Sequence, residues 1–581
     1  MKKAIALFLS LMTVLTVSGC GSSAPEAAQP QEPAAAVQPQ EPAAAAQTQE
    51  TEENAPEQEP TPAPTATPAP TPTPYPGTTE DGLSYEVYSD HVIITGCDEK
   101  ATSVTVPETI EGKPVTGIGD GAFERHIPLN SVSLPESITS IGDSAFAWST
   151  RLADLNIPDG VTDIGDFAFA GCQFLREIHI PASLETIGRY VYYYSSPTVL
   201  SIPEGVKVIG DHAFAECDHL TSISLPDTVT EIGEGAFNDC DNLASFHIPD
   251  SVESIGDAAF GECPRLKEFS VDASPYFSTV DGVLFSADGT QMISFPIGRK
   301  SPTYSIPEGV TTICDHAFTT HFILWYAVTK IDIPASVTNI GEYAFDLPCL
   351  EEFSVAGDNP SYSSLDGVLF NKDQTELIAY PNSKTGDYSI PEGVTRIGDR
   401  AMFTSFALSR LTIPASVTSI GVDAFPTATQ YDYAASLKFN KPILRDITVD
   451  SANPQYSSVD GMLYSKDQTQ LLVFPAGRPG DNQTIPEGTT SIAYHAFFRC
   501  RDLKRITIPE GVTSIENNAF TGCWRLISAR VPVSLQSIGE DAFSSCFDLA
   551  TFQYAGTQEQ WERVSVGEDA LPSDLTVYYE S

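Results

Sequence analysis

The chain has 581 residues, with 77 acidic and 31 basic side chains and a formal net charge of −46. So acidic a chain lacks the basic footprint of a nucleic-acid-binding protein, and charge alone would not hold it to an anionic membrane surface. The length would ordinarily predict three or four domains, and the 41% of hydrophobic residues are enough for a large core.

Residues 1–19 are predicted to be a secretory signal peptide. Lys2 and Lys3 precede an apolar run that is too short for a membrane-spanning helix and is followed by small residues. The ending, VSGC, resembles a bacterial lipobox, which implies that Cys20 carries a diacylglyceryl group and becomes the new N-terminus. Two acyl chains anchor stably, so we expect a lipid-anchored protein on the extracellular face of the cell envelope. An ordinary signal peptide with a coincidental cysteine is the alternative.

Residues 20–77 are predicted to form a disordered linker that starts with the lipidated cysteine. The segment is rich in Pro, Ala and Glu, and it shows no hydrophobic periodicity. Such a composition cannot bury enough apolar surface to offset the entropy of folding, and its Pro-rich end should be extended. We interpret the segment as a spacer between the membrane and a folded domain.

A 23-residue repeat begins near residue 78, and its most regular mark is an Ala-Phe pair, as at Phe214, Phe237 and Phe260. The unit reads LxxIxIPxxVxxIGxxAFxxC, and a period in the twenties with aliphatic residues at fixed offsets predicts a leucine-rich-repeat solenoid. Residues 78–581 should therefore form one elongated domain, with an N-terminal entry cap and a C-terminal cap from about residue 550.

One coil illustrates the expected structure. Residues 222–225 alternate in polarity and should form a strand of a parallel concave sheet, which Pro226 closes because proline has no N–H for a ladder. The glycine of the IG pair should relieve crowding rather than supply a positive φ, since Cys314, Ala493 and Glu516 replace it in other copies. The Ala-Phe pair is predicted to lie on a short helical turn on the convex side, with its phenylalanine in the core.

Three longer units, which start at Val271, Val355 and Val449, interrupt this rhythm. Each holds two short apolar runs around a turn, which predicts a β-hairpin, most clearly at Asp288-Gly289. Their aspartates also suggest calcium, but no spacing matches a known calcium loop such as the EF-hand. We therefore predict neither a metal site nor a cofactor.

The repeat resembles that of the BspA-like leucine-rich-repeat family of bacterial surface proteins, over roughly residues 80–581. The resemblance includes an entry segment, YEVYSDHVIITGC, and a closing segment, YAGTQEQWERVSV. The motif is specific for the fold and poorly specific for function, because one scaffold carries many ligands. The resemblance implies adhesion to proteins of a host or a neighbouring cell.

Seven cysteines lie three residues after the phenylalanine of the repeat. An exported protein could form disulfides, but consecutive copies cannot pair off evenly. We interpret these residues as buried thiols that pack as small apolar groups. They are Cys172, Cys217, Cys240, Cys263, Cys500, Cys523 and Cys546.

The sequence offers no catalytic constellation. It contains no HExxH, no GxSxG and no phosphate-binding glycine loop. His212, His316 and His495 each precede a repeat phenylalanine by two residues, and this shared register predicts surface positions of the repeat rather than general acids or bases. We therefore predict no enzymatic activity.

Aromatic segments break the repeat at residues 189–197, 321–328 and 426–442, each at or just after the Ala-Phe turn. The outward positions of the expected concave sheet are small or polar and lack such anchors. Tyrosine combines a large contact area with a polar tip, so the tyrosines that we expect to be exposed are the candidate ligand-binding residues. They are Tyr193, Tyr194, Tyr431 and Tyr433, whereas Trp325 and Phe322 are expected to be buried. Alternatively, these loops only pack on neighbouring coils.

Taken together, these features predict a lipid-anchored, non-enzymatic cell-surface protein that recognises or adheres to an extracellular protein. Binding of a glycan or a cell-wall polymer is the alternative. We expect no nucleic-acid partner, and no contact with the membrane beyond the lipid anchor.

Overall fold

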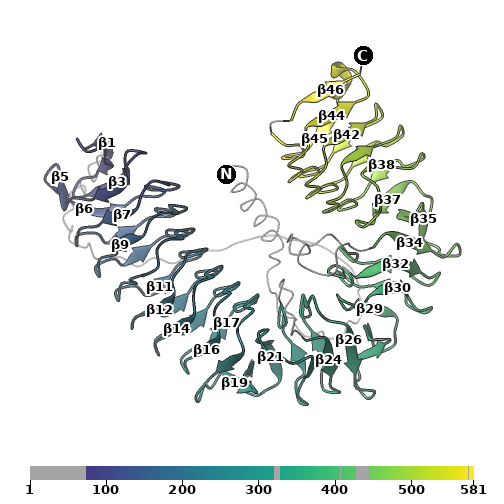
Figure 1. Cartoon of the computed structure of the whole chain (residues 1–581), viewed down its shortest axis with the longest axis horizontal. Helices are drawn as coiled ribbons and strands as arrows, with labels where there is room; N and C mark the ends of the chain where they lie inside the picture. Colours follow the sequence, from purple (N-terminus) through teal and green to yellow (C-terminus); the bar gives the residue numbers. More distant parts are fainter. Residues whose placement is uncertain (1–72, 320–327, 406, 427–443, 574, 581) are drawn as a thin grey trace, which may run out of the picture. The chain divides into compact units, whose positions relative to one another are not determined.

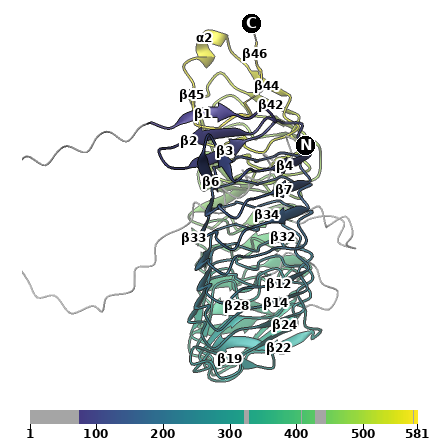
Figure 2. The same ribbon diagram turned by 90° about the vertical axis from the view of Figure 1, so that its left-hand side faces the viewer.

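Two ladders of parallel strands run through the stacked coils, and each regular coil adds a strand to both (Figure 1). The computed structural model describes residues 73–319, 328–405, 407–426, 444–573 and 575–580. Strands of the two ladders lie on opposite sides of the stack (Figure 2). The expected parallel-strand solenoid is therefore confirmed.

The long-strand ladder is built from the LxxIxI segments of the repeat. Phe246 is buried between two exposed neighbours, because one face of the ladder lies on the core. Adjacent strands pair in register, so Phe246 lies beside Phe269. The strands are β4 (Ser103–Thr105), β7 (Ser131–Ser133), β9 (Asp154–Asn156), β12 (Val199–Ser201), β14 (Ser222–Ser224), β16 (Ser245–His247), β18 (Glu268–Ser270), β22 (Thr303–Ser305), β24 (Lys330–Ile333), β26 (Glu352–Val355), β30 (Gly386–Ser389), β32 (Leu408–Ile413), β34 (Asp446–Val449), β38 (Asn482–Thr484), β40 (Arg505–Thr507), β42 (Ser528–Val531), β44 (Thr551–Tyr554) and β46 (Val577–Tyr579).

The short-strand ladder is built from the residues just before the glycine of the IG pair. Most of its strands have two residues, and the isoleucines of neighbouring coils lie side by side, as Ile209 and Ile232 do. The strands are β6 (Lys113–Ile118), β8 (Ser140–Ile141), β10 (Asp163–Ile164), β11 (Thr186–Ile187), β13 (Val208–Ile209), β15 (Glu231–Ile232), β17 (Ser254–Ile255), β21 (Gln291–Ser294), β23 (Thr312–Ile313), β25 (Asn339–Ile340), β29 (Glu376–Ala379), β31 (Arg396–Ile397), β33 (Ser419–Ile420), β37 (Gln470–Val473), β39 (Ser491–Ile492), β41 (Ser514–Ile515), β43 (Ser537–Ile538) and β45 (Ser565–Val566).

The segment that carries the Ala-Phe pair is not helical, which corrects the expected helical turn. We call this segment, residues 142–149 in one coil, the arch. Within it Ser144 has a φ of 54° and Trp148 a φ of 59°, and a right-handed helix cannot contain such left-handed residues. The arch bonds to its neighbour instead, since the N–H of Phe146 donates to a carbonyl of the next coil at 2.8 Å.

The glycine of the IG pair is required by the close approach of neighbouring coils, as expected. The φ of Gly256 is not left-handed. A Cβ on Gly256 would lie 2.4 Å from the backbone nitrogen of Glu234 on the preceding coil. A Cβ atom cannot lie so close to a backbone atom, so this position requires glycine because it has no side chain.

Aspartates bind the coils together directly after this glycine. Oδ1 of Asp143 accepts a hydrogen bond from the N–H of Asp166 at 2.9 Å, and Asp120 makes the same bond to Asp143. Threonine hydroxyls likewise donate to carbonyl oxygens of the preceding coil, as Thr230 does to Lys207. Polar residues therefore recur in the repeat because each satisfies a backbone group that its own coil leaves unpaired.

Aromatic rings form a stacked column in the core of the early coils, from Phe123 to Phe260. Phe214 and Phe237 stack with ring centres 5.6 Å apart and planes 5° apart. Tyr192 takes the phenylalanine position in the degenerate coil and stacks 5.4 Å from Phe169 and 5.4 Å from Phe214. The column therefore passes through the coil in which the sequence pattern is weakest.

The seven repeat cysteines are buried free thiols, in agreement with the interpretation from the sequence. Each Sγ donates to the carbonyl of the core aromatic residue on the preceding coil, as Cys240 does to Phe214 at 3.3 Å. Burial raises the pKa of the Cys172 thiol to about 12, so this thiol stays protonated and is a poor nucleophile.

Each long unit places additional antiparallel strands between the two ladders. In the first, β19 (Phe277–Val280) pairs with β20 (Val283–Ser286), β20 pairs with β21, and β21 then continues the short-strand ladder. The same pairing recurs twice in the later long units. The additional strands there are β27 (Tyr362–Leu365), β28 (Val368–Asn371), β35 (Tyr456–Val459) and β36 (Met462–Ser465).

The long units have no arch. Phe295 occupies the core aromatic position, since its N–H donates to Ala317 O at 2.8 Å and its ring stacks 4.9 Å from Phe318. Only two residues separate Phe295 from Met292, the core residue of β21, where a regular coil has four. The next coil carries Cys314 at its IG glycine position.

Irregular elements close both ends. At the N-terminal end β1 (Tyr75–Thr78) and β2 (Ser84–Val87) form a hairpin that continues through β3 (Val92–Gly96) to β6, and β5 (Thr109–Ile110) also pairs with β6. Since β1 begins at Tyr75, regular structure starts three residues before the expected boundary. At the C-terminal end α2 (Gln558–Trp561) lies between β44 and β45, and Thr557 caps it.

Candidate functional site

Tyr193 and Tyr194 lie in the described part of the chain, and the expected exposure is wrong for Tyr193. Tyr193 is 4% exposed, because its ring packs edge-on against Tyr190 and its hydroxyl donates to Oε1 of Glu216 at 2.7 Å. Tyr194 is half-buried, with its ring 5.9 Å from that of Trp148. Neither residue is a freely exposed anchor.

Other residues singled out from the sequence lie outside the described residues. They are Cys20, Phe322, Trp325, Tyr431 and Tyr433. Lipid attachment and ligand binding at these positions stay predictions.

A second aromatic column lies on the arches of the early coils, outside the core. Phe167, Tyr190 and His212 all occupy the left-handed position before the Ala-Phe pair on consecutive coils. Phe167 stacks on Tyr190 with centres 4.6 Å apart, and Tyr190 stacks on His212 at 4.7 Å. The column ends at Gly235, where a Cβ would lie 2.4 Å from the His212 ring.

We call Phe167, Tyr190, His212, Trp148 and Tyr194 the aromatic edge. Phe167, Trp148 and Tyr194 are half-buried, so one part of each ring is held by the coils and the other part faces solvent. Burial lowers the pKa of His212, which favours the neutral imidazole in the stack. The edge therefore offers a rigid surface of ring faces and polar tips.

Sequence reasoning identified the tyrosine-rich segment of this edge but missed Phe167 and Trp148. Both lie in copies that match the repeat, and neither position belongs to the consensus. The available signal was an aromatic residue directly before Ala-Phe, as in the letters DFAF that contain Phe167.

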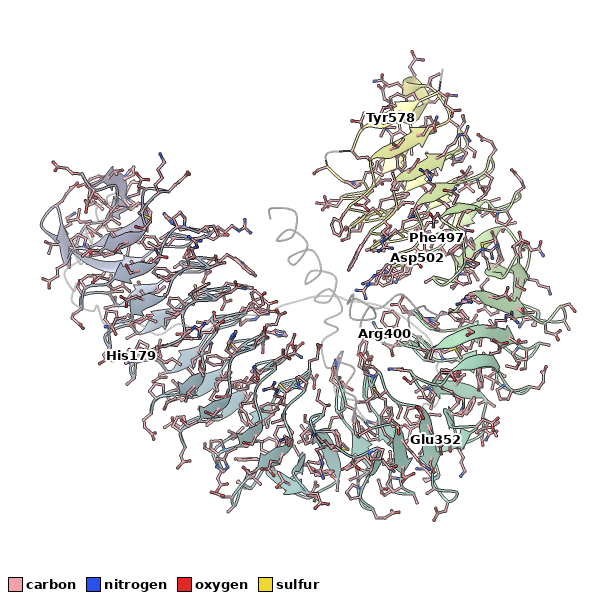
Figure 3. All side chains as sticks on the ribbon, in the orientation of Figure 1. His179, Glu352, Arg400, Phe497, Asp502 and Tyr578 are labelled. Atoms are coloured by element: carbon pink, nitrogen blue, oxygen red, sulfur yellow. The ribbon has the colours of Figure 1, made fainter. Side chains whose placement is uncertain are left out.

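The outward face of the long-strand ladder is polar, as expected. Ser222 and Ser224 are exposed, and a ring nitrogen of His247 lies 3.1 Å from Oγ of Ser270. Two strands depart from this pattern, with Val199 of β12 65% exposed and Tyr578 of β46 52% exposed. Figure 3 shows Arg400 at the inner edge of the curved stack and His179 at its outer edge.

A trough of about 830 Å³ runs along the short-strand ladder of the early coils. The glycines of the IG pairs line it, one for each coil, because they leave no side chains there. The trough is therefore a consequence of the repeat, and it does not by itself indicate a ligand-binding site. The lining glycines are Gly119, Gly142, Gly165 and Gly188.

The polar clusters of the described residues do not assemble a metal site. No group of three or more His, Cys, Asp or Glu side chains there has the geometry to hold a metal ion. Asp288, which suggested calcium, accepts bonds from Ser286 and Thr290 and so stabilises its own turn. Burial raises the pKa of Cys314 to about 11, the opposite of what a nucleophile needs.

The three histidines that share a register are packed side chains of the arches. His212 stacks on Tyr190, His316 stacks on Tyr343, and His495 stacks on Phe498 with centres 4.1 Å apart. No helix of the described residues has the length and apolar character that crossing a bilayer demands.

These features define a leucine-rich-repeat solenoid. The residues that depart from the repeat consensus, such as those of the aromatic edge, lie on the surface of its coils. The family model for BspA-type leucine-rich repeat regions matches residues 96–198, 185–301, 299–432 and 479–564, which together are well over half of the chain. The chain belongs to this family.

Several solved structures are similar over most of the chain. A leucine-rich cell surface protein from Faecalibacterium prausnitzii is 28% identical, with 85% of this chain and 98% of that chain covered and a TM-score of 0.32. A leucine-rich repeat protein from Bacteroides ovatus is 20% identical, with 87% and 99% covered and a TM-score of 0.40. The pneumococcal vaccine antigen PcpA is 16% identical, with 87% and 99% covered and a TM-score of 0.39. No curated protein matches the chain.

Proposed function

We propose that this chain is a non-enzymatic recognition or adhesion protein of the bacterial cell surface, and that it binds an extracellular protein. The observation that carries the proposal is the aromatic edge, which lies outside the repeat consensus and is not needed to build a coil. Aromatic rings with polar tips are the groups that protein interfaces favour, and rings that are already stacked lose little entropy on binding. Membership of the BspA-type family supports a repeat protein displayed at the surface.

Binding of the full-length protein to target cells tests this proposal. The double variant Phe167→Ser/Tyr194→Ser should bind at least ten times more weakly, because the edge loses two of its ring faces. Val422→Ser is the control, since Val422 is 59% exposed on a distant coil. Melting curves of both variants show whether weaker binding comes from the loss of a contact or from the loss of the folded structure. Protease treatment of the target cells should abolish binding, and binding that survives this treatment would contradict a protein ligand.

A glycan is the second candidate, and the C-terminal coils favour it. The guanidinium of Arg501 lies 4.0 Å from the ring centre of Trp524, and the Trp524 ring lies 6.4 Å from that of Phe547. Phe547 is 40% exposed, and the apolar face of a sugar packs readily on such a ring. Binding that is lost after glycosidase treatment and in Trp524→Ser, but kept in the Phe167→Ser/Tyr194→Ser variant, would establish this alternative.

A lipid on Cys20 and the linker of residues 20–77 complete the proposal, since they would hold the solenoid away from the membrane. Cys20→Ala should abolish incorporation of a labelled fatty acid and release the protein from the membrane fraction. Cys97→Ala is the control, because Cys97 is a free thiol inside the folded part. An unlabelled wild-type protein would contradict the anchor.

A further inference from the structure

The long units bring together arches that are not consecutive in the sequence. Because a long unit has no arch, the arch of the coil before it meets the arch of the coil after it. At the first long unit the N–H of Glu262 donates directly to Thr319 O at 3.2 Å. We call these meeting points the first, second and third junctions, in chain order.

At the second and third junctions, a basic side chain of the following coil reaches back and fills the gap. The guanidinium carbon of Arg400 lies 4.5 Å from the ring centre of Tyr343, and its Nη1 lies 3.4 Å from a carboxylate oxygen of Glu342. At the third junction Nδ1 of His495 lies 2.6 Å from Oδ1 of Asp423, and both side chains are 13% exposed. The chain thus fills both gaps with side chains of its own, the guanidinium of Arg400 and the imidazole of His495.

At the first junction the corresponding place is open. His316 has the same register as Arg400 and His495, but its ring stacks on Tyr343 of the following coil, with centres 4.9 Å apart and planes at 10°. The facing residue of the preceding arch, Ala258, has only a methyl group. A pocket of about 350 Å³ lies between the two arches.

The pocket is lined by groups that suit a cation. Glu253, Asp257 and Asp315 contribute three carboxylates, and Tyr276 contributes a ring that is 41% exposed. Burial, and then the negative charge of Asp315, raise the pKa of Asp257. Asp257 and Asp315 therefore repel each other, and a cation placed between them would relieve this repulsion. His316 also lines the pocket and lies on its C-terminal side.

We propose that this pocket binds the guanidinium group of an arginine that a protein partner presents. The proposal rests on the proposed function, because it names a chemical group that the recognised protein carries. The second junction supplies the precedent within the chain, where a ring and a carboxylate hold Arg400. A guanidinium fits such a site better than an ammonium, since it is planar, stacks on a ring and donates two N–H groups to one carboxylate. The net charge of −46 attracts a basic segment and speeds its encounter.

The test is titration calorimetry of the full chain with acetyl-Gly-Arg-Gly-amide. The same peptide with citrulline is the matched probe, because citrulline keeps the shape of arginine and lacks its charge. We expect the arginine peptide to bind with a Kd on the order of 1 mM, as befits one side chain, and the citrulline peptide to bind at least ten times more weakly.

Two variants locate the binding at the pocket. Asp257→Asn removes one carboxylate and should weaken arginine binding about tenfold. His316→Arg should abolish it, because the new guanidinium can reach back as Arg400 does, and Arg400 itself holds a φ of 52° in this register. Glu540→Gln removes an exposed carboxylate at the register of Asp257 on a C-terminal coil, and it should bind as the wild type does.

Each contrary outcome overturns the proposal. These outcomes are no arginine binding at 10 mM peptide (about ten times the expected Kd), equal binding of arginine and citrulline, or an Asp257→Asn protein that binds like the wild type. If His316→Arg unfolds, the Asp257→Asn comparison decides alone. The peptide assay uses no target cells, so its failure leaves the recognition function standing, and the Phe167→Ser/Tyr194→Ser assay tests that function separately.

Discussion

Replacing Gly256 with alanine tests whether crowding selects the glycine of the IG pair. The added Cβ would lie 2.4 Å from the nitrogen of Glu234 and 2.7 Å from the carbonyl carbon of Gly233, both backbone atoms of the preceding coil. Neither atom can move without shifting its coil, and overpacking of this kind costs about 1–3 kcal/mol. Alanine also lowers the conformational entropy of the unfolded chain, which stabilises the folded state by about 0.4–1 kcal/mol. We therefore expect a net loss of about 1–2 kcal/mol in the free energy of unfolding.

Urea unfolding followed by circular dichroism measures this loss, and hydrogen exchange shows whether it is confined to the neighbouring coils. Local fraying is expected, because each coil of a solenoid contacts only its neighbours. Gly357→Ala is the matched control, since nothing lies within 4 Å of its added Cβ and its φ is not left-handed. That variant should be unchanged or up to about 1 kcal/mol more stable. If both variants behaved alike, crowding could not be the reason for the glycine.

Three further substitutions test the core, the links between coils and a buried carboxyl. Phe237→Ala should cost about 3–5 kcal/mol in urea unfolding, because a fully buried, stacked ring is lost, and a change below about 0.5 kcal/mol would place the ring elsewhere. Asp143→Ala should cost about 1–2 kcal/mol, since the N–H of Asp166 loses its acceptor, whereas Asp143→Asn should recover most of this loss in the same assay. Burial raises the pKa of Asp239 to about 9, so the folded chain keeps a proton that the unfolded chain loses, and stability falls as the pH rises from about 4 to 9. Asp239→Asn should flatten this profile and raise the melting temperature at pH 8, and a profile identical to that of the wild type would refute the assignment.

The periodicity of apolar residues was sufficient to predict the core. Leu220, Val229, Ile232 and Phe237 are fully buried, as their spacing indicated, because every coil must hide the same side of the chain. Ile223 of the same coil is only half-buried. Spacing identifies the inward face but does not tell how closely neighbouring coils cover each position.

The conformation of the arch could not be predicted from residue types. A left-handed φ is normally signalled by glycine or asparagine, yet Ser144, Tyr190, His212 and Arg400 adopt it here. Hydrogen bonds to the next coil impose the conformation, and such bonds exist only after the coils have stacked. The exposure predicted for Tyr193 was wrong for the same reason, since a helical turn and the arch direct successive side chains differently.

The candidate site was still harder to predict, because it depends on an element that is missing. The pocket at the first junction exists because the first long unit has no arch and because Ala258 is small. The small residue is visible directly after Asp257, but the missing arch has no signature in the neighbouring letters. Each junction forms only in the folded chain, because it joins two arches that are not consecutive in the sequence.

The links between coils also determine how the molecule responds to a pulling force. Aspartate side chains, arch amides and strand ladders all bond one coil to the next, and the described coils contain no disulfide to share a load across several of them. A pull on the chain ends therefore breaks one set of bonds at a time and detaches coils singly from an end. Each 23-residue coil releases about 80 Å of extended chain when it detaches. Under load the folded part would therefore lengthen in steps, and the coils that remain stacked would stay folded.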